Sequence, residues 1–185
     1  MENILYTVTV FSENRVGLLN QISIIFTRRK LNIESLSVSP SSIKGVHKFT
    51  ITAYSDKETI EKLVKQIEKR IDVLKSFYYN DDELVYQEIA LYKVPTDELL
   101  NEQNLEAIIR RHNARILEIT REYTVIEKTG HSEETEALFA ELKTYDIRQF
   151  VRSGRVAVTK SPQEYVTMFI DEQAQRKEKI QWENK

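Results

Sequence analysis

The feature that most constrains the fold of this chain is one order of strand and helix patterns that occurs twice, about 80 residues apart. In the first copy, Tyr6, Val8 and Val10 alternate with threonines, which predicts a half-buried strand. From Leu18 onward the apolar residues recur at helical spacing. Two strands, a helix and a last strand follow. This β-α-β-β-α-β order is the ferredoxin-like arrangement, an antiparallel sheet with two helices on one face.

The two copies predict an α+β protein with two ferredoxin-like βαββαβ domains. The first copy has strand patterns at 6–10, 32–40, 46–54 and 71–79, a helix from Leu18 to the basic run at 28–30, and a helix capped by Asp56. The second has strand patterns at 84–94, 114–119, 122–128 and 147–154, and helix patterns at 99–112 and 130–145. We therefore predict domains at 1–79 and 84–160, joined by a charged linker at 80–83.

A third segment follows the second copy. It begins with a strong helix start. Ser161 is the expected N-cap, Pro162 stands at the first helical position, and Glu164 is the capping-box partner of Ser161. We expect a C-terminal helical tail over 161–185, whose apolar residues dock near its beginning.

Composition excludes several classes of function. The chain has no cysteine, so disulfides, thiolate metal sites and cysteine nucleophiles are excluded. With 4 glycines it cannot build a P-loop or a dinucleotide-binding fingerprint. A formal net charge of −2 argues against nucleic-acid binding. No apolar run approaches the roughly 18 residues of a membrane span, and the N-terminal sequence does not resemble a signal peptide, so we expect a cytoplasmic protein.

No set of side chains indicates catalysis. His47, His112 and His131 fall on a strand, a helix end and a helix start, without ligand spacing, so structural roles are favoured over a metal or a base. The acidic run at 80–83 is more typical of a solvated linker than of a metal site. Because no nucleophile with a base and no acid pair stands out, a binding or regulatory protein is favoured over an enzyme, with no catalytic residue and no metal.

The loop before the first helix is the best candidate site. The first N–H groups of a helix lack partners and can hold a carboxylate. Gly17 would let a ligand approach the backbone, and Asn14 offers a donor and an acceptor, which suits a free amino acid. The structural alternative is that Asn14 caps the helix and Gly17 relaxes a tight turn. The residues alone leave both interpretations open.

Longer motifs point to a family. "ENRVGLLNQISIIFTRRKLNIESLSVSP", followed by "KQIEKRIDVLKS", resembles the small, regulatory subunit of acetolactate synthase, also called acetohydroxyacid synthase. The specific pieces are "ENxxGxL", ending at Leu19, and "NIESLxVxP", ending at Pro40. Residues 1–79 resemble that family's N-terminal ACT domain, an amino-acid-binding and dimerisation module. The second copy resembles its C-terminal ferredoxin-like domain, where "RSG" at 152–154 fits the final strand.

The resemblance implies a homodimer of ACT domains that share one continuous sheet, with the feedback amino acid at their interface. The ligand is usually valine; whether isoleucine or leucine binds better is left open. One subunit would contribute the first loop, and the other the region where the second strand begins. The implied effector-binding residues are Asn14, Val16, Gly17, Leu18, Asn32 and Ile33. For Asn32, a helix C-cap in the left-handed conformation is a structural alternative.

The resemblance also implies a partner, the catalytic large subunit. That subunit would carry thiamine diphosphate, magnesium and FAD, and this chain none of them. The small subunit would activate the large one and make it sensitive to feedback in branched-chain amino acid biosynthesis. The implied activation residues are Gln66, Lys69, Val73 and Lys75. Alternatively, Ile67, Ile71 and Val73 form core while Gln66 and Lys69 are solvated.

A second function from another class stays open, a stand-alone amino-acid-sensing regulator built from ACT-type domains. Such a protein would need a DNA-binding element or another effector. The sequence has no helix-turn-helix with a basic recognition helix, and its charge is slightly acidic. The family reading is therefore preferred.

Overall fold

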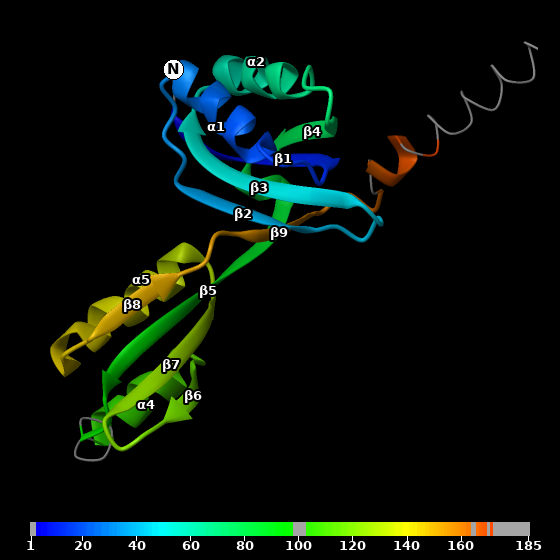
Figure 1. Cartoon of the computed structure of the whole chain (residues 1–185). Helices are drawn as coiled ribbons and strands as arrows, with labels where there is room; N and C mark the ends of the chain where they lie inside the picture. The colour runs from blue at the N-terminus through cyan, green and yellow to red at the C-terminus, as the bar shows by residue number, and fades with distance from the viewer. Residues whose placement is uncertain (1–2, 98–102, 164–165, 170, 172–185) are drawn as a thin grey trace, which may run out of the picture. The chain divides into compact units, whose positions relative to one another are not determined.

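The computed structural model describes residues 3–97, 103–163, 166–169 and 171, which form two compact units. The first lies within residues 1–85 and 158–185, and the second comprises 86–157 (Figure 1). Each holds an antiparallel sheet with helices in the ferredoxin-like order, so the predicted α+β class is confirmed. The predicted domain boundaries stay a prediction.

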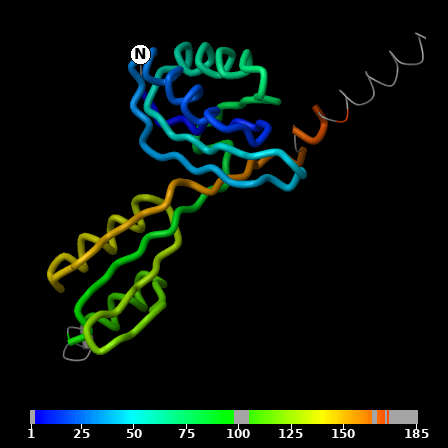
Figure 2. Tube along the Cα trace, in the orientation of Figure 1, coloured from blue at the N-terminus to red at the C-terminus, as the bar shows by residue number. Residues whose placement is uncertain are grey.

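The first unit follows the predicted order closely, and Figure 2 traces its path. Its sheet has the strand order β2-β3-β1-β4, with all neighbours antiparallel. Both helices lie on one side of this sheet (Figure 1). The elements are β1 (Ile4–Glu13), α1 (Leu18–Arg28), β2 (Ser35–Pro40), β3 (Val46–Ser55), α2 (Lys57–Ile67) and β4 (Val73–Tyr79).

The strand register defines the two ends of this sheet, at which its strands begin or stop. We call them the first and second edges, as distinct from the outermost strands β2 and β4. At the first edge, Ser12 of β1 lies opposite both His47 of β3 and Val73 of β4, and Pro40 of β2 also lies opposite His47. At the second edge, Ile4 lies opposite Ser55. The loop between β1 and α1 therefore belongs to the first edge, whereas the segment that leads into β2 belongs to the second.

The core of the first unit lies between the helices and the sheet. The side chains of Val8, Val10 and Ile51 from the sheet and of Ile22 and Ile25 from α1 are fully buried. The alternating pattern of β1 and the helical spacing of α1 thus meet on one apolar surface, as expected from the sequence.

The prediction that β1 is only half buried is wrong. Thr7 and Thr9 are 0% and 5% exposed, although they face away from the helices. The reason is that β1 lies inside the sheet and that its second face is also covered. Phe11 on that face packs in a cluster with Val46 and with Val166 from the C-terminal segment.

The second unit repeats the architecture. Its sheet has the order β6-β7-β5-β8, and β9 pairs with β5. The turn η1 (Asp81–Glu83) occupies the predicted linker. The elements that follow are β5 (Leu84–Pro95), α4 (Gln103–Arg111), β6 (Arg115–Ile119), β7 (Tyr123–Gly130), α5 (Ser132–Leu142), η2 (Lys143–Tyr145), β8 (Gln149–Arg152) and β9 (Val156–Thr159).

Two local expectations differ from the structure of this unit, and a third falls outside the described residues. The strand β9 was not expected, because its four residues carry too short a pattern without their partner β5. The sequence favours Ser132 as the N-cap of α5, but the cap is His131, whose backbone N–H donates to the Glu134 carboxylate at 2.8 Å. Residues 98–102, where the helix of 99–112 was predicted to begin, lie outside the described residues.

The C-terminal segment is described only in part. Residues 166–169 are helical, as predicted, but residues 161–163, where the helix was predicted to begin, form bends instead. Most of the expected tail helix, 172–185, lies outside the described residues. Val166 is 1% exposed and joins Phe11 and Val46 in the apolar cluster on the second face of the first sheet. The beginning of the tail therefore contributes to the first unit.

This docking makes a stability prediction. Val166→Ala removes two buried methyl groups, so we expect the free energy of unfolding of the first unit to fall by about 1–3 kcal/mol. Thermal unfolding of the full chain measures the change. Met168→Ala, two residues on at a 43% exposed position, is the matched control and should leave the transition in place. An unchanged transition in the Val166 variant would show that the tail does not stabilise the unit.

Candidate functional site

The loop between β1 and α1 opens toward solvent at the first edge of the sheet. Gly17 is the N-cap of α1 and has φ +85°, a left-handed conformation that favours glycine. A Cβ added there would meet no atom within 4 Å, so the space above Gly17 is open. Asn14 is exposed and does not cap the helix, because the N-cap of α1 is Gly17, three residues later, and no side chain bonds to the helix start. The alternative interpretation of Asn14 as a cap is wrong.

The start of α1 is electrostatically suited to an anion. No side chain caps this helix, and its first turn contains no acidic residue. The N–H of Leu18 bonds to the Arg15 carbonyl at a long 3.3 Å, and the regular helical bonding begins with Gln21 N–H to the Gly17 carbonyl at 3.1 Å. The positive end of the helix dipole thus faces an open loop, where a carboxylate is stabilised.

The other predicted effector-binding residues lie between α1 and β2. Asn32 is exposed, and Ile33 is partly buried against the core. The left-handed residue that ends α1 is Lys30, with φ 57°, so Asn32 is not the C-cap proposed as its structural alternative. Asn32 stays available for a ligand.

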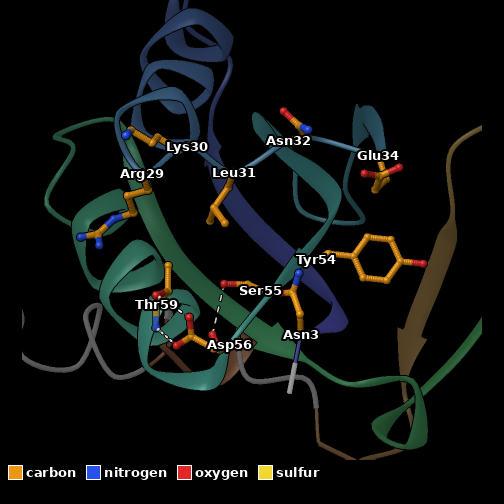
Figure 3. A pocket seen from close by; sticks show the side chains of 10 residues that line it. All are labelled: Asn3, Arg29, Lys30, Leu31, Asn32, Glu34, Tyr54, Ser55, Asp56 and Thr59. Atoms are coloured by element: carbon orange, nitrogen blue, oxygen red, sulfur yellow. Dashed lines mark hydrogen bonds between the residues drawn. The ribbon is translucent and has the colours of Figure 1, made fainter. Parts of the chain in front are cut away.

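Figure 3 shows Asn32 on the wall of a cavity of about 460 Å³. Several of the polar groups around this cavity already have partners in the fold. The Asp56 carboxylate accepts the Thr59 N–H at 2.9 Å, and this hydrogen bond lowers the pKa of Asp56. Arg29 donates to Gln66 at 2.9 and 3.2 Å. These bonds cap α2 and join α1 to α2, so the positions of Arg29, Asp56 and Thr59 are explained without a ligand.

One chain does not bring the two halves of the predicted effector site together. Gly17 and Asn32 flank opposite ends of α1, whose 11 residues span about 16 Å. They also lie at opposite edges of the sheet. A free amino acid is too small to contact both residues in one chain.

The predicted activation residues lie in different environments. Lys69 is exposed, whereas Val73 is 8% exposed and belongs to the core. Lys75 forms an ion pair with Glu68 at 2.8 Å. The alternative reading of this segment holds for Val73 but is wrong for Ile71, whose side chain is 98% exposed.

Two of the three histidines make contacts that hold elements of the second unit together. The ring of His112 hydrogen-bonds to Glu141 at 3.0 Å, and this bond lowers the pKa of the carboxyl group. His131 packs edge-on against Tyr86, with ring centroids 4.4 Å apart. Within the described residues, no three acidic or histidine side chains gather as a metal site. The helices of those residues are also too short or too polar to cross a bilayer.

Comparison with known protein families matches both units. The family described as "Small subunit of acetolactate synthase" matches residues 87–161, and the family described as "AHAS small subunit-like ACT domain" matches residues 8–75. The second match includes the loop with Gly17 and the segment with Asn32, and it ends at Lys75.

Individual relatives agree with these matches. The acetolactate synthase small subunits of Mycolicibacterium smegmatis and Bacillus subtilis are each 34% identical to the chain over 85% of its length, and the matches cover 92% and 91% of those proteins. A crystal structure of the acetolactate synthase small subunit from Thermotoga maritima superposes with a TM-score of 0.77 and 28% identity, covering 86% of this chain and 99% of the other.

Proposed function

This chain belongs to the acetolactate synthase small-subunit family, and from that premise we propose that it is the regulatory subunit of an acetolactate synthase, which activates a catalytic large subunit and makes it sensitive to valine. The catalytic cofactors, thiamine diphosphate, magnesium and FAD, would belong to the large subunit. The feedback part of the proposal rests on one observation. Gly17 and Asn32 lie at opposite ends of α1, so a ligand can contact both only if a second copy of the chain supplies one of them.

The outermost strand β2 of the first sheet supports a homodimer. β2 lies at one side of the sheet, where its outer backbone groups can pair with another strand. Val38 on β2 is 42% exposed, so apolar surface is available on that strand. Antiparallel pairing of β2 with the β2 of a second copy would extend the sheet across a two-fold axis and cover this surface.

The same pairing would complete the effector site. Two antiparallel β2 strands run in opposite directions, so the second edge of one copy lies beside the first edge of the other. The segment with Asn32 from one subunit then faces the loop with Gly17 from its partner. Two equivalent sites result, each built from both chains.

The chemistry of such a site fits a branched-chain amino acid. The N–H groups at the start of α1 would hold the ligand carboxylate, and the amides of Asn14 and Asn32 would bind its polar groups. The side chain of Leu18 is 1% exposed and packs in the core, so Leu18 can contribute only backbone. Val16 would also contribute backbone, and Ile33 would supply apolar surface for the branched side chain.

The energetic demands of this regulator are modest. An affinity between about 1 mM and 1 μM corresponds to roughly −4 to −8 kcal/mol, which a few hydrogen bonds and one buried isopropyl group can supply. Valine would inhibit by binding one of two states of the assembly more tightly. A coupling free energy of about 1–3 kcal/mol is typical of such control.

The first test uses Gly17. In enzyme reconstituted from this chain and its large subunit, Gly17→Asp should strongly reduce valine inhibition, because it places a negative charge beside the ligand carboxylate. Gly45→Asp is the matched control, since Gly45 has φ +82° and the same open surroundings in the β2–β3 turn. The readouts are inhibition of activity and calorimetric titration with valine, isoleucine and leucine. Full valine inhibition in the Gly17 variant would contradict the site. Failure of the wild-type chain to bind or activate the large subunit would favour a stand-alone regulator.

The second test asks whether each site is shared between two chains. Asn32→Ala should abolish valine binding while the protein stays folded and dimeric by light scattering. Mixing this variant with Gly17→Asp and allowing the subunits to exchange should restore binding, because each mixed dimer then has one site with both native residues. About half of the mixed dimers' sites should titrate. A site contained within one chain would give no restoration.

A further inference from the structure

The cavity of about 460 Å³ at the second edge of the first sheet is lined by charged groups of both signs, and the fold uses only some of them. The guanidinium of Arg29 is bonded to α2. The Asp56 carboxylate accepts the N–H and the hydroxyl of Thr59, at 2.9 and 2.8 Å. Within the part of the chain that the structure describes, the ammonium of Lys30 and the carboxylate of Glu34 make no hydrogen bond or ion pair. The cavity therefore has one unused cation and one unused anion.

The backbone holds Glu34 in place at this cavity. Its N–H donates to the Thr52 carbonyl at 2.8 Å, directly before the β2–β3 ladder begins with Ser35 opposite Thr52. The Glu34 side chain is exposed and lines the cavity two residues after Asn32. Figure 3 shows the side chains of Lys30 and Glu34 on opposite sides of Leu31. The unused carboxylate thus stands next to a residue of the proposed effector site, and away from the unused cation.

An unused charge of each sign fits a zwitterion better than a simple anion. A free amino acid carries one ammonium and one carboxylate, whereas the α-keto acid with the same carbon skeleton carries only the carboxylate. An ammonium group that is withdrawn from water needs an anionic or hydrogen-bonding acceptor. The other half of the proposed site offers no unused carboxylate, because Glu13 pairs with Arg15 at 3.1 Å and Asp72 faces the same Arg15 at 3.8 Å.

We propose that Glu34 binds the ammonium group of the effector and thereby makes the site selective for an amino acid over its α-keto acid. The inference rests on the proposed function and adds a specificity-determining residue to it. In the shared site, the start of α1 in one subunit holds the ligand carboxylate, and Glu34 of the other subunit receives the ammonium. The positive charge of Lys30 favours the same orientation, with the ligand carboxylate turned away from Glu34.

The dimer would strengthen this contact. Glu34 directly precedes β2, so the proposed pairing of two β2 strands places it beside the interface between subunits. Ion pairs that are fully exposed contribute little to binding, because water and salt screen them. Partial enclosure between two chains reduces that screening, so the same carboxylate discriminates better in the dimer than it would on one chain.

The selectivity has a regulatory meaning. An amino acid and its α-keto acid are interconverted by transamination and share the branched side chain that Ile33 would contact, so apolar surface alone cannot separate them. A fixed charged group can, because a ligand without the ammonium leaves the carboxylate unpaired. Feedback would then respond to the finished amino acid rather than to its precursor.

The test is Glu34→Gln in the full chain, titrated calorimetrically with valine and with α-ketoisovalerate, its α-keto acid. The wild type should bind valine at least about tenfold more tightly than α-ketoisovalerate, and the variant should bind valine about 10- to 100-fold more weakly than the wild type does. Binding of α-ketoisovalerate should not weaken. Valine inhibition of the reconstituted enzyme should weaken in parallel, and thermal unfolding without ligand should not change.

Glu58→Gln is the matched control. Glu58 is an exposed carboxylate in the first turn of α2, outside the cavity lining, and it pairs with Lys62. This variant should keep the wild-type affinity for valine and the wild-type preference over α-ketoisovalerate. Equal loss of valine binding in both variants would overturn the role of Glu34, because the effect would then follow from the net charge of the unit.

The other outcomes separate the inference from the function beneath it. Wild-type valine affinity in Glu34→Gln would overturn the inference and leave the proposed function intact. Equal weakening of valine and α-ketoisovalerate would also overturn it, because Glu34 would then shape the site without contacting the ammonium. A wild-type chain that binds no branched-chain amino acid, alone or with its large subunit, would overturn the proposed feedback function together with the inference.

Discussion

The antiparallel ladder between β1 and β3 is the constraint on which the first unit depends. It runs without interruption from Ile4 opposite Ser55 to Glu13 opposite Val46. Side chains alternate along a strand, so a shift of one residue would turn Val8 and Val10 out of the core. The ladder therefore cannot slip. It fixes which loops meet at each edge of the sheet, and it thereby fixes the distance between the two halves of the proposed effector site.

The second unit is held by a different interaction, a buried chain of hydrogen bonds between sheet and helix. The Tyr92 hydroxyl donates to the Thr135 carbonyl at 2.6 Å, and the Thr135 hydroxyl donates to Glu88 at 2.6 Å. Burial raises the pKa of Tyr92, so its hydroxyl keeps its proton and remains a donor at neutral pH. Fully satisfied polar networks of this kind specify one arrangement of a core. Here the network sets the position of α5 on β5.

Periodic patterns predicted the fold because each element buries a continuous apolar face, as β1 and α1 do. Sequence reasoning failed where one residue decides the backbone path. Ile71 lies two residues before Val73 and would share its face of a strand, so it was counted as possible core. A turn closed by the hydrogen bond from Val73 N–H to the Arg70 carbonyl makes β4 begin later and leaves Ile71 outside the core. In the same way, the left-handed residue after α1 is Lys30 rather than Asn32. The effector site is harder still to derive from one chain, because its two halves never meet there.

A site shared between subunits has a thermodynamic consequence. Ligand binding and dimerisation become linked, because only the dimer holds the complete site, so the ligand stabilises the dimer by mass action. Association with the proposed large subunit is a third equilibrium, and it joins these two wherever the effector changes the affinity between the subunits. Linkage is reciprocal. If valine lowers the affinity for the large subunit by some factor, the large subunit lowers the affinity for valine by the same factor. The free regulatory dimer would then bind valine more tightly than the assembled enzyme does, and feedback would be strongest where the catalytic partner is scarce.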